Sequence, residues 1–174
     1  MMNEAVMVMN NHSNNRNDEW YTPQEYVEAA RQVMGAIDLD PASNADTNAR
    51  IGAAEFFSIE NSAFENDWHG RVWMNPPYSR VIKHFVKKLC DSYREGTVTE
   101  AIVVTNNGTD TKWFHEMASI SSGVCLPIGR IGFLNEQGQK IDNNNKGQVF
   151  TYIGPNWERF KTVFERYGRV YYNA

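Results

Sequence analysis

A short apolar run, followed after one residue by two consecutive prolines, constrains the fold of this chain more than any other feature. The run is Val72-Trp73-Met74, and Asn75-Pro76-Pro77-Tyr78 follows it directly. Both prolines have a fixed φ and no N–H group, which makes the turn rigid. A segment with helical spacing comes next and places four apolar side chains on one face: Ile82, Phe85, Val86 and Leu89. The pattern predicts a strand, a rigid turn and a helix.

Similar alternation runs along the rest of the chain and predicts an α/β fold. Short apolar or β-branched runs predict strands at 36–39, 55–57, 71–74, 101–105, 123–127, 130–134, 148–153 and 169–172. Helical spacing predicts helices at 23–34, 46–54, 111–120 and 156–167, besides the one after the prolines. This order is typical of a mostly parallel sheet, with antiparallel strands near the carboxyl terminus. In such sheets ligands bind beyond the carboxyl ends of the strands.

The first predicted helix has a clear start, whereas the residues before it have no periodicity. Thr22-Pro23-Gln24-Glu25 has the pattern of a capping box, and Gly35 ends the helix. Residues 1–17 are rich in Asn and Met and are interpreted as a flexible arm. The 174 residues are enough for one domain with a proper core, which we place at 18–174.

Composition argues against several classes of protein. No apolar run is long enough to span a bilayer, and no secretory signal is visible, so a cytoplasmic location without membrane contact is expected. The two cysteines, Cys90 and Cys125, are expected to be buried free thiols. The four histidines form no ligand pattern, which predicts no metal site.

Charge gives two opposing indications about a nucleic-acid partner. The net charge of −4 argues mildly against phosphate contacts, which need cations. One predicted helix and its end nevertheless carry five basic residues: Arg80, Lys83, Lys87, Lys88 and Arg94. They form either a solvated surface or a DNA contact, and the sequence leaves both open.

The Asn-Pro-Pro-Tyr turn suits one chemical problem, the activation of an exocyclic adenine amine. That amine is a poor nucleophile because its lone pair is delocalised into the ring. The side-chain oxygen of Asn75 and the carbonyl of Pro76 can each accept one amine hydrogen, and the prolines add no competing donor. Tyr78 offers a flat face for a base taken out of its stack. The alternative is an ordinary turn between strand and helix.

Three other segments carry candidate ligand-binding residues. Asp40-Pro41 ends the first predicted strand, where a carboxylate can face the cationic end of S-adenosylmethionine, or else it is only a turn. Trp20, Tyr21 and Thr22 either shield the methionine part of that cofactor or form a helix cap. Asp67 either accepts from the cofactor's adenine amine or lies beside a packed Trp68.

Together these segments resemble the phage-type Dam DNA N6-adenine methyltransferases over about residues 20–133. The matching segments are Trp20-x-Thr22-Pro23, Asp38-Leu39-Asp40-Pro41-Ala42, Asp67-Trp68, Val72 to Tyr78, Thr109-Asp110-Thr111-x-Trp113-Phe114-His115 and Gly129-Arg130-Ile131-x-Phe133. The last two are not required by generic methyl transfer, so they favour this family over methyltransferases at large.

The resemblance implies a Rossmann-like methyltransferase fold, with S-adenosylmethionine as the donor and a flipped-out adenine in DNA as the acceptor. It implies that the catalytic residues are Asn75, Pro76, Pro77 and Tyr78. It assigns seven residues to the cofactor site: Trp20, Tyr21, Thr22, Asp38, Asp40, Pro41 and Asp67. A role in phage or restriction–modification DNA methylation is also implied, although the sequence identifies no partner restriction enzyme.

The sequence departs from the family pattern at three places. No G-x-G follows Asp40, and Ala63-Phe64 stands before Asp67-Trp68 where a leucine is expected. The loop after the 101–105 strand is the polar Asn106-Asn107-Gly108, and this change affects target choice and not the chemistry. No separate target-recognition domain is visible, so recognition must come from loops or from a second copy, which makes a dimer one option.

Three other functions stay open: methylation of RNA, methylation of a protein glutamine, and a non-catalytic nucleic-acid-binding module on a methyltransferase fold.

Overall fold

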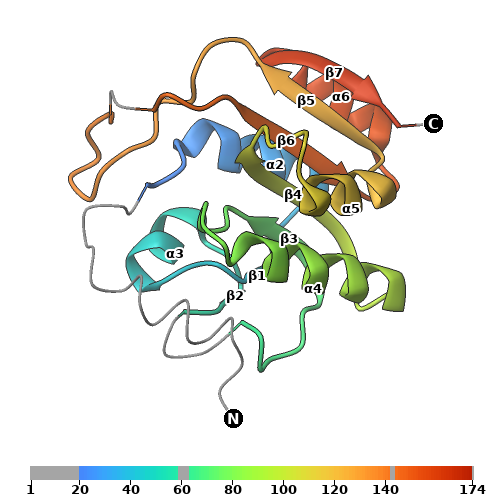
Figure 1. The fold of residues 1–174 in the computed structure, drawn as a ribbon. Helices are drawn as coiled ribbons and strands as arrows, with labels where there is room; N and C mark the ends of the chain where they lie inside the picture. The colour runs from blue at the N-terminus through green and yellow to red at the C-terminus, as the bar shows by residue number, and fades with distance from the viewer. Residues whose placement is uncertain (1–19, 59–62, 142–143, 174) are drawn as a thin grey trace.

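A single seven-stranded sheet forms the centre of the fold (Figure 1). The computed structural model describes residues 20–58, 63–141 and 144–173, so the arm expected at 1–17 lies outside it. The strands are β1 (Leu39–Asp40), β2 (Glu55–Phe56), β3 (Gly70–Met74), β4 (Val98–Asn106), β5 (Gly123–Pro127), β6 (Gln148–Ile153) and β7 (Gly168–Tyr172). The helices are α2 (Gln24–Met34), α3 (Ala45–Ile51), α4 (Ile82–Glu95), α5 (Lys112–Ile120) and α6 (Trp157–Phe164).

The sheet has a parallel half and an antiparallel half. Its strand order is β2-β1-β3-β4-β6-β5-β7. The pairings among β2, β1, β3 and β4 are parallel, whereas those of β4 with β6, β6 with β5 and β5 with β7 are antiparallel. The sheet is therefore mixed, with three parallel and three antiparallel pairings among the described residues, and the prediction of a mostly parallel sheet is wrong. The predicted antiparallel pairing near the carboxyl terminus is confirmed.

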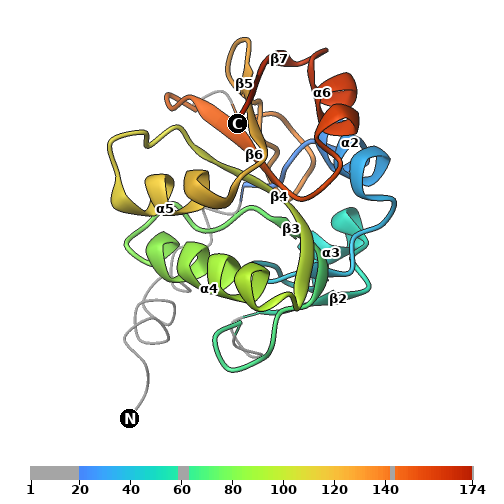
Figure 2. The same ribbon diagram turned by 90° about the vertical axis from the view of Figure 1, so that its right-hand side faces the viewer.

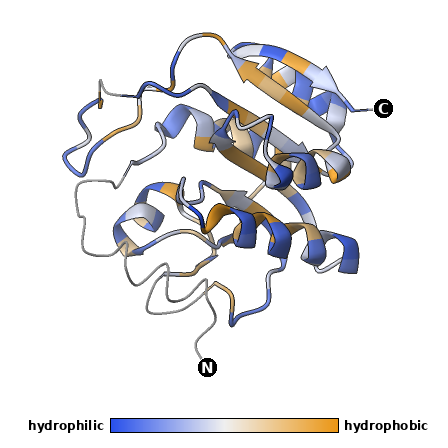
Figure 3. Cartoon of the chain, in the orientation of Figure 1, coloured by the Kyte–Doolittle hydropathy of each residue, from blue (hydrophilic) through white to orange (hydrophobic). Residues whose placement is uncertain are grey.

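Helices cover both faces of the sheet because side chains alternate along the strands. Val72 and Met74 of β3 pack in one apolar cluster with Phe85 and Leu89 of α4. Trp73, between them in sequence, packs in a second cluster on the opposite face, which includes residues of α2 and α6. Figure 2 shows α4 and α5 on one side of the strands and α2, α3 and α6 on the other. The most apolar residues gather on the central strands (Figure 3).

Most predicted elements are present, with ends that differ by a few residues. α4 buries the four predicted apolar residues, Ile82, Phe85, Val86 and Leu89. α2 ends at Gly35, whose φ of 85° is the left-handed conformation that glycine adopts most easily. Thr111 caps α5, since its side chain accepts from the Phe114 N–H. Cys90 and Cys125 are buried free thiols.

Two local predictions are wrong. Residues 130–134 do not form a strand: Ile131 and Phe133 are buried in the core, and Leu134 makes only isolated bridges, to Tyr21 and Lys140. The Thr22 capping box is also absent, because the N-cap position of α2 is Pro23 and no side chain caps it. The Thr22 side chain instead contacts Asn75, which is far from it along the chain and lies in the candidate site.

Candidate active site at the carboxyl ends of β1 and β3

Two polar turns lie side by side at what we call the carboxyl edge, where β1, β3 and β4 end. β1 pairs in parallel with β3, with Leu39 opposite Val72. Asp40-Pro41 and Asn75-Pro76 therefore leave neighbouring strands at the same end of the sheet. β4 runs parallel on the other side of β3, with Met74 opposite Val103, and ends nearby at Asn106. The structure thus brings together the two turns that the sequence proposed separately.

The side-chain amide of Asn75 is held at both ends. Its Nδ2 donates to Thr22 Oγ1 at 3.2 Å, and its Oδ1 accepts from the Tyr78 hydroxyl at 2.8 Å. Thr22 is buried, whereas Asn75 and Tyr78 are half-buried. An amide oxygen has two lone pairs, so Oδ1 keeps one acceptor site beside the tyrosine. Burial raises the pKa of Tyr78, which keeps its hydroxyl protonated as a donor.

The two prolines differ in exposure. Pro76 is buried and Pro77 is exposed. The Pro77 carbonyl accepts from the Ser79 N–H at 2.9 Å, which closes the turn before α4. Within the described part of the chain, the Pro76 carbonyl accepts no hydrogen bond. Asn75 Oδ1 and the Pro76 carbonyl are therefore two acceptors with capacity left, on adjacent residues of a rigid turn.

Asp40 is a buried carboxylate with uncharged partners. Only 2% of its surface is exposed, and its Oδ1 accepts from the Ala42 N–H at 3.1 Å. Burial raises the pKa of Asp40 to about 7, although hydrogen bonds from the Ala42 backbone and the Ser43 side chain oppose this rise. No lysine or arginine among the described residues forms an ion pair with it. Such a carboxylate gains most from a cationic ligand.

Trp20 and Tyr21 lie against the segment after β5 instead of forming a helix cap. Tyr21 and Leu134 exchange two backbone hydrogen bonds, each of 2.9 Å. The Trp20 ring packs on Phe133 with centroids 5.5 Å apart, and the Arg50 guanidinium lies 4.4 Å from the centroid of the Tyr21 ring. These contacts anchor the chain just before Thr22, whose hydroxyl reaches Asn75.

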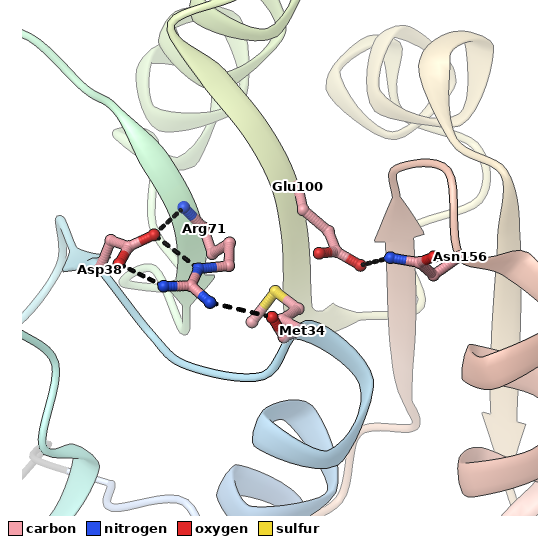
Figure 4. Close-up of polar contacts among 5 residues, drawn as sticks. All are labelled: Met34, Asp38, Arg71, Glu100 and Asn156. Carbon is pink, nitrogen blue, oxygen red and sulfur yellow. Dashed lines mark hydrogen bonds and ion pairs between the residues drawn. The ribbon is translucent and has the colours of Figure 1, made fainter.

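Asp38 lies apart from this site, at the beginning of the same strands (Figure 4). We call that end the amino edge. The Asp38 carboxylate binds Arg71 in a bidentate ion pair, with Nε–Oδ2 at 2.7 Å and Nη2–Oδ1 at 2.8 Å. It also accepts from the Arg71 backbone N–H. Gly70 makes room for this contact, because a Cβ there would lie 2.6 Å from Asp38 Oδ2. We therefore leave Asp38 out of the proposed cofactor site.

Asp67 is not brought to the carboxyl edge by any contact either. It is exposed, in the segment that leads to the beginning of β3, and its charge acts on Lys88 of α4. Its neighbour Trp68 is buried and donates from Nε1 to the Ala63 carbonyl at 2.8 Å. The packing interpretation thus describes Trp68 well, and the role of Asp67 in the cofactor site stays a prediction.

Sequence analysis missed a network of buried amides beside the site. Gln148 Nε2 donates to Asn106 Oδ1 at 3.0 Å, and Asn144 Nδ2 donates to both Gln148 Oε1 and the Ile131 carbonyl at 2.9 Å. These contacts join the end of β4 to the segments that precede β6. Isolated Asn and Gln in polar stretches give no sequence signal for such a network, because their partners are distant along the chain.

The described residues also bear on binding of metal, membrane and DNA. No group of three or more His, Cys, Asp or Glu side chains there could hold a metal ion. No helix among them is both long and apolar enough to cross a membrane. On α4, Lys87 pairs with Asp91 at 2.6 Å, so this part of the predicted basic surface is partly neutralised.

Comparison with known proteins places the chain in a class of DNA-modifying enzymes. The model of the DNA N-6-adenine-methyltransferase (Dam) family matches residues 9–169. The chain therefore belongs to this family, as the resemblance of its motifs indicated.

Two phage proteins are among its relatives. The DNA N-6-adenine-methyltransferase of Haemophilus phage HP1 is 29% identical over 154 residues, which cover 86% of each protein. The DNA N-6-adenine-methyltransferase of Escherichia phage T1 is 29% identical over 150 residues, or 76% of this chain. The matched part spans 60% of the T1 protein's length.

Proposed function

We propose that this protein transfers a methyl group from S-adenosylmethionine to the exocyclic N6 of an adenine in DNA. The observation that carries the proposal is the Asn75 turn: two acceptors with remaining capacity lie on a rigid turn beside Asp40, in a chain of the Dam family. We also infer that the fold is a Rossmann-like methyltransferase fold, and the parallel half of the sheet supports this inference.

The residues at the carboxyl edge suit the proposed cofactor. Asp40 is a buried carboxylate with only uncharged contacts, so a cationic α-amino group would relieve its unfavourable burial. S-adenosylmethionine carries such a group, and it supplies an activated methyl when bound. Pro41 is buried next to Asp40. Trp20, whose ring packs on Phe133, and Tyr21 would contact the methionine part of the cofactor. Asp38 has no part in this assignment.

The acceptor amine would lie between Asn75 and Pro76. One amine hydrogen would donate a hydrogen bond to Asn75 Oδ1 and the other to the Pro76 carbonyl, which would localise the nitrogen lone pair toward the methyl group. As the N–CH3 bond formed, the S–CH3 bond would break and release S-adenosylhomocysteine, and the nitrogen would lose one hydrogen as a proton to solvent. As the nitrogen becomes tetrahedral, its hydrogens become more acidic and these two bonds strengthen. The interaction is thus stronger in the transition state than in the ground state, which is what raises kcat. Holding the reactants in this geometry contributes further.

Tyr78 has two roles in this arrangement. Its ring is half-buried against the α4-side core and offers a face for a flipped adenine. Its hydroxyl donates to Asn75 Oδ1, so it occupies one lone pair of the proposed catalytic oxygen and directs the other. The tyrosine therefore both stacks on the base and orients the oxygen that accepts the amine hydrogen.

DNA is the proposed partner, and a bacterial host cell infected by phage is the proposed location, because the relatives are phage proteins. Loops at the carboxyl edge, including Asn106 to Asp110 with its attached amide network, would lie beside the flipped base. Recognition by a second copy of the chain remains an alternative that a sedimentation experiment on the DNA complex would decide.

A substrate panel with radiolabelled methyl donor tests the proposal against its rivals. Purified protein is incubated with random-sequence DNA, with RNA and with glutamine-containing peptides, and hydrolysed products are separated by chromatography. We expect N6-methyladenine from DNA alone. Label in methylcytosine, in RNA or in glutamine would reject the proposed substrate. No label together with DNA binding and no cofactor binding would favour the non-catalytic module.

A further inference from the structure

The hydrogen bond between Thr22 and Asn75 joins two segments that are far apart in the sequence. Thr22 precedes the first described helix, whereas Asn75 follows β3, and their side chains meet at 3.2 Å. Thr22 is 5% exposed, so water does not compete freely for its hydroxyl. A buried, cross-chain contact to the proposed catalytic amide needs an explanation beyond local folding.

The chain around Thr22 holds this hydroxyl in place from both sides. On one side, the paired backbone hydrogen bonds between Tyr21 and Leu134 anchor the preceding residue. On the other side, Pro23 has a φ of −54° and begins the turn that leads into α2. A residue before proline is restricted to extended conformations, which removes further freedom from Thr22. The usual role of a threonine here, capping the helix, is not used.

The orientation of the Asn75 amide decides whether it can help the proposed reaction. The oxygen and nitrogen ends have nearly the same shape, but only the oxygen can accept an amine hydrogen. A flipped amide would present two N–H donors to the substrate amine, which is itself a donor. Thr22 accepts from Nδ2 while Tyr78 donates to Oδ1, so the two hydroxyls hold the amide from opposite ends.

We propose that Thr22 is a positioning residue that orients the Asn75 amide for methyl transfer. This inference rests on the proposed function, because it assigns Thr22 to the reaction through Asn75 and not to the cofactor. Thr22 touches neither reactant in this role. Its contribution is to accept from Asn75 Nδ2 and so hold the amide plane in place, which leaves the second lone pair of Oδ1 for the adenine amine.

Three variants separate the hydroxyl of Thr22 from its volume. Thr22→Val keeps the branched shape and removes the acceptor, whereas Thr22→Ser keeps the acceptor. Thr162→Val removes a threonine hydroxyl on the exposed face of α6, where it donates to the Glu158 carbonyl at 2.9 Å, and serves as the matched control. We expect Thr22→Val to lower kcat by about tenfold, as the loss of one buried hydrogen bond allows. KM for DNA and the cofactor Kd should stay within about threefold.

Thr22→Ser should recover most of the kcat that Thr22→Val loses, and Thr162→Val should match the wild type. A Thr22→Val enzyme with wild-type kcat would overturn the inference. A variant whose only defect is weaker cofactor binding would also overturn it, since Thr22 would then be a cofactor ligand.

A measurement that does not depend on activity distinguishes this inference from the proposed function. The side-chain amide protons of Asn75 can be followed by ¹⁵N NMR and assigned by their absence in Asn75→Asp. We expect one proton to be shifted by its hydrogen bond in the wild type and in Thr22→Ser, and to lose that shift in Thr22→Val. Unchanged amide signals in Thr22→Val would refute the positioning role even if no DNA methylation were found.

Discussion

The two ends of the parallel strands hold their polar groups in opposite ways. At the amino edge, Arg71 binds Asp38 in a bidentate ion pair (Figure 4). At the carboxyl edge, Asp40 and Asn75 have only uncharged partners and retain acceptor capacity. Groups that satisfy each other stabilise the fold, whereas groups that are oriented but not saturated can bind a ligand. The carboxyl edge therefore carries the proposed function.

Removing the Asp40 carboxylate should have the largest effect on cofactor binding. Asp40→Ala is expected to weaken S-adenosylmethionine binding by about 30-fold to a few thousandfold, because loss of one partner of a buried charge pair costs about 2–5 kcal/mol. Thermal unfolding should show a folded protein, since the buried charge that is lost was unfavourable. Isothermal titration calorimetry measures the affinity. Near-normal affinity would remove Asp40 from the site.

The pH dependence of cofactor binding should reveal the same carboxylate. Because burial raises the pKa of Asp40 to about 7, the free protein holds a proton there below that pH. Binding to a cationic group requires the charged form, so affinity should fall about tenfold for each pH unit below 7 and level off above it. Asp40→Asn should abolish this dependence. A wild-type affinity that is constant from pH 5.5 to 8 would contradict the assignment.

The two aspartates should also contribute to the stability of the free protein with opposite signs. The raised pKa of Asp40 means that the folded state binds more protons than the unfolded state between about pH 4 and 7, so stability falls as pH rises through that window. The Arg71 ion pair lowers the pKa of Asp38, so its contribution is present above pH 4 and is lost as pH falls. Chemical unfolding of Asp40→Asn and Asp38→Asn across pH separates the two.

Breaking the amino-edge ion pair should change stability but not chemistry. Arg71→Met removes the partner of Asp38, and both side chains are about one-third exposed, so solvent screening reduces the effect to about 1 kcal/mol. Denaturant unfolding measures this loss, and kcat should remain within twofold of the wild type. An Arg71→Met protein of normal stability but much lower kcat would mean that the amino edge takes part in function.

Among the changes at the carboxyl edge, the smallest effect on kcat is expected for loss of the Tyr78 hydroxyl. Tyr78→Phe keeps the stacking face and loses only the hydrogen bond to Asn75, so kcat should fall by about two- to tenfold on a plasmid substrate. Tyr78→Ala should lose about 1–3 kcal/mol more, because it also loses the stacking on the base. Equal activities of the Phe and Ala variants would exclude the stacking role.

Local pattern predicted much of the fold and the centre of the site. Apolar alternation located the strands around the Asn75 turn, and strand order along the chain indicated that Asp40 would be near it. Long-range partners could not be predicted: Arg71 binding Asp38 and Thr22 binding Asn75 depend on which strands become neighbours. The segment 130–134 shows the same limit, since its alternating Ile131 and Phe133 fit a strand but enter the core beside Tyr21 instead.

Methyl transfer by Asn75→Ala, measured next to Arg71→Met, tests most directly whether chemistry resides at the carboxyl edge. A binding measurement first confirms that both proteins are saturated with labelled S-adenosylmethionine. Single-turnover formation of N6-methyladenine in DNA is then followed. Asn75→Ala should bind the cofactor normally but react about 100- to 1,000-fold more slowly, as expected for the loss of a group that stabilises the transition state. Arg71→Met should react at the wild-type rate. Near-wild-type transfer by Asn75→Ala would contradict the proposed mechanism.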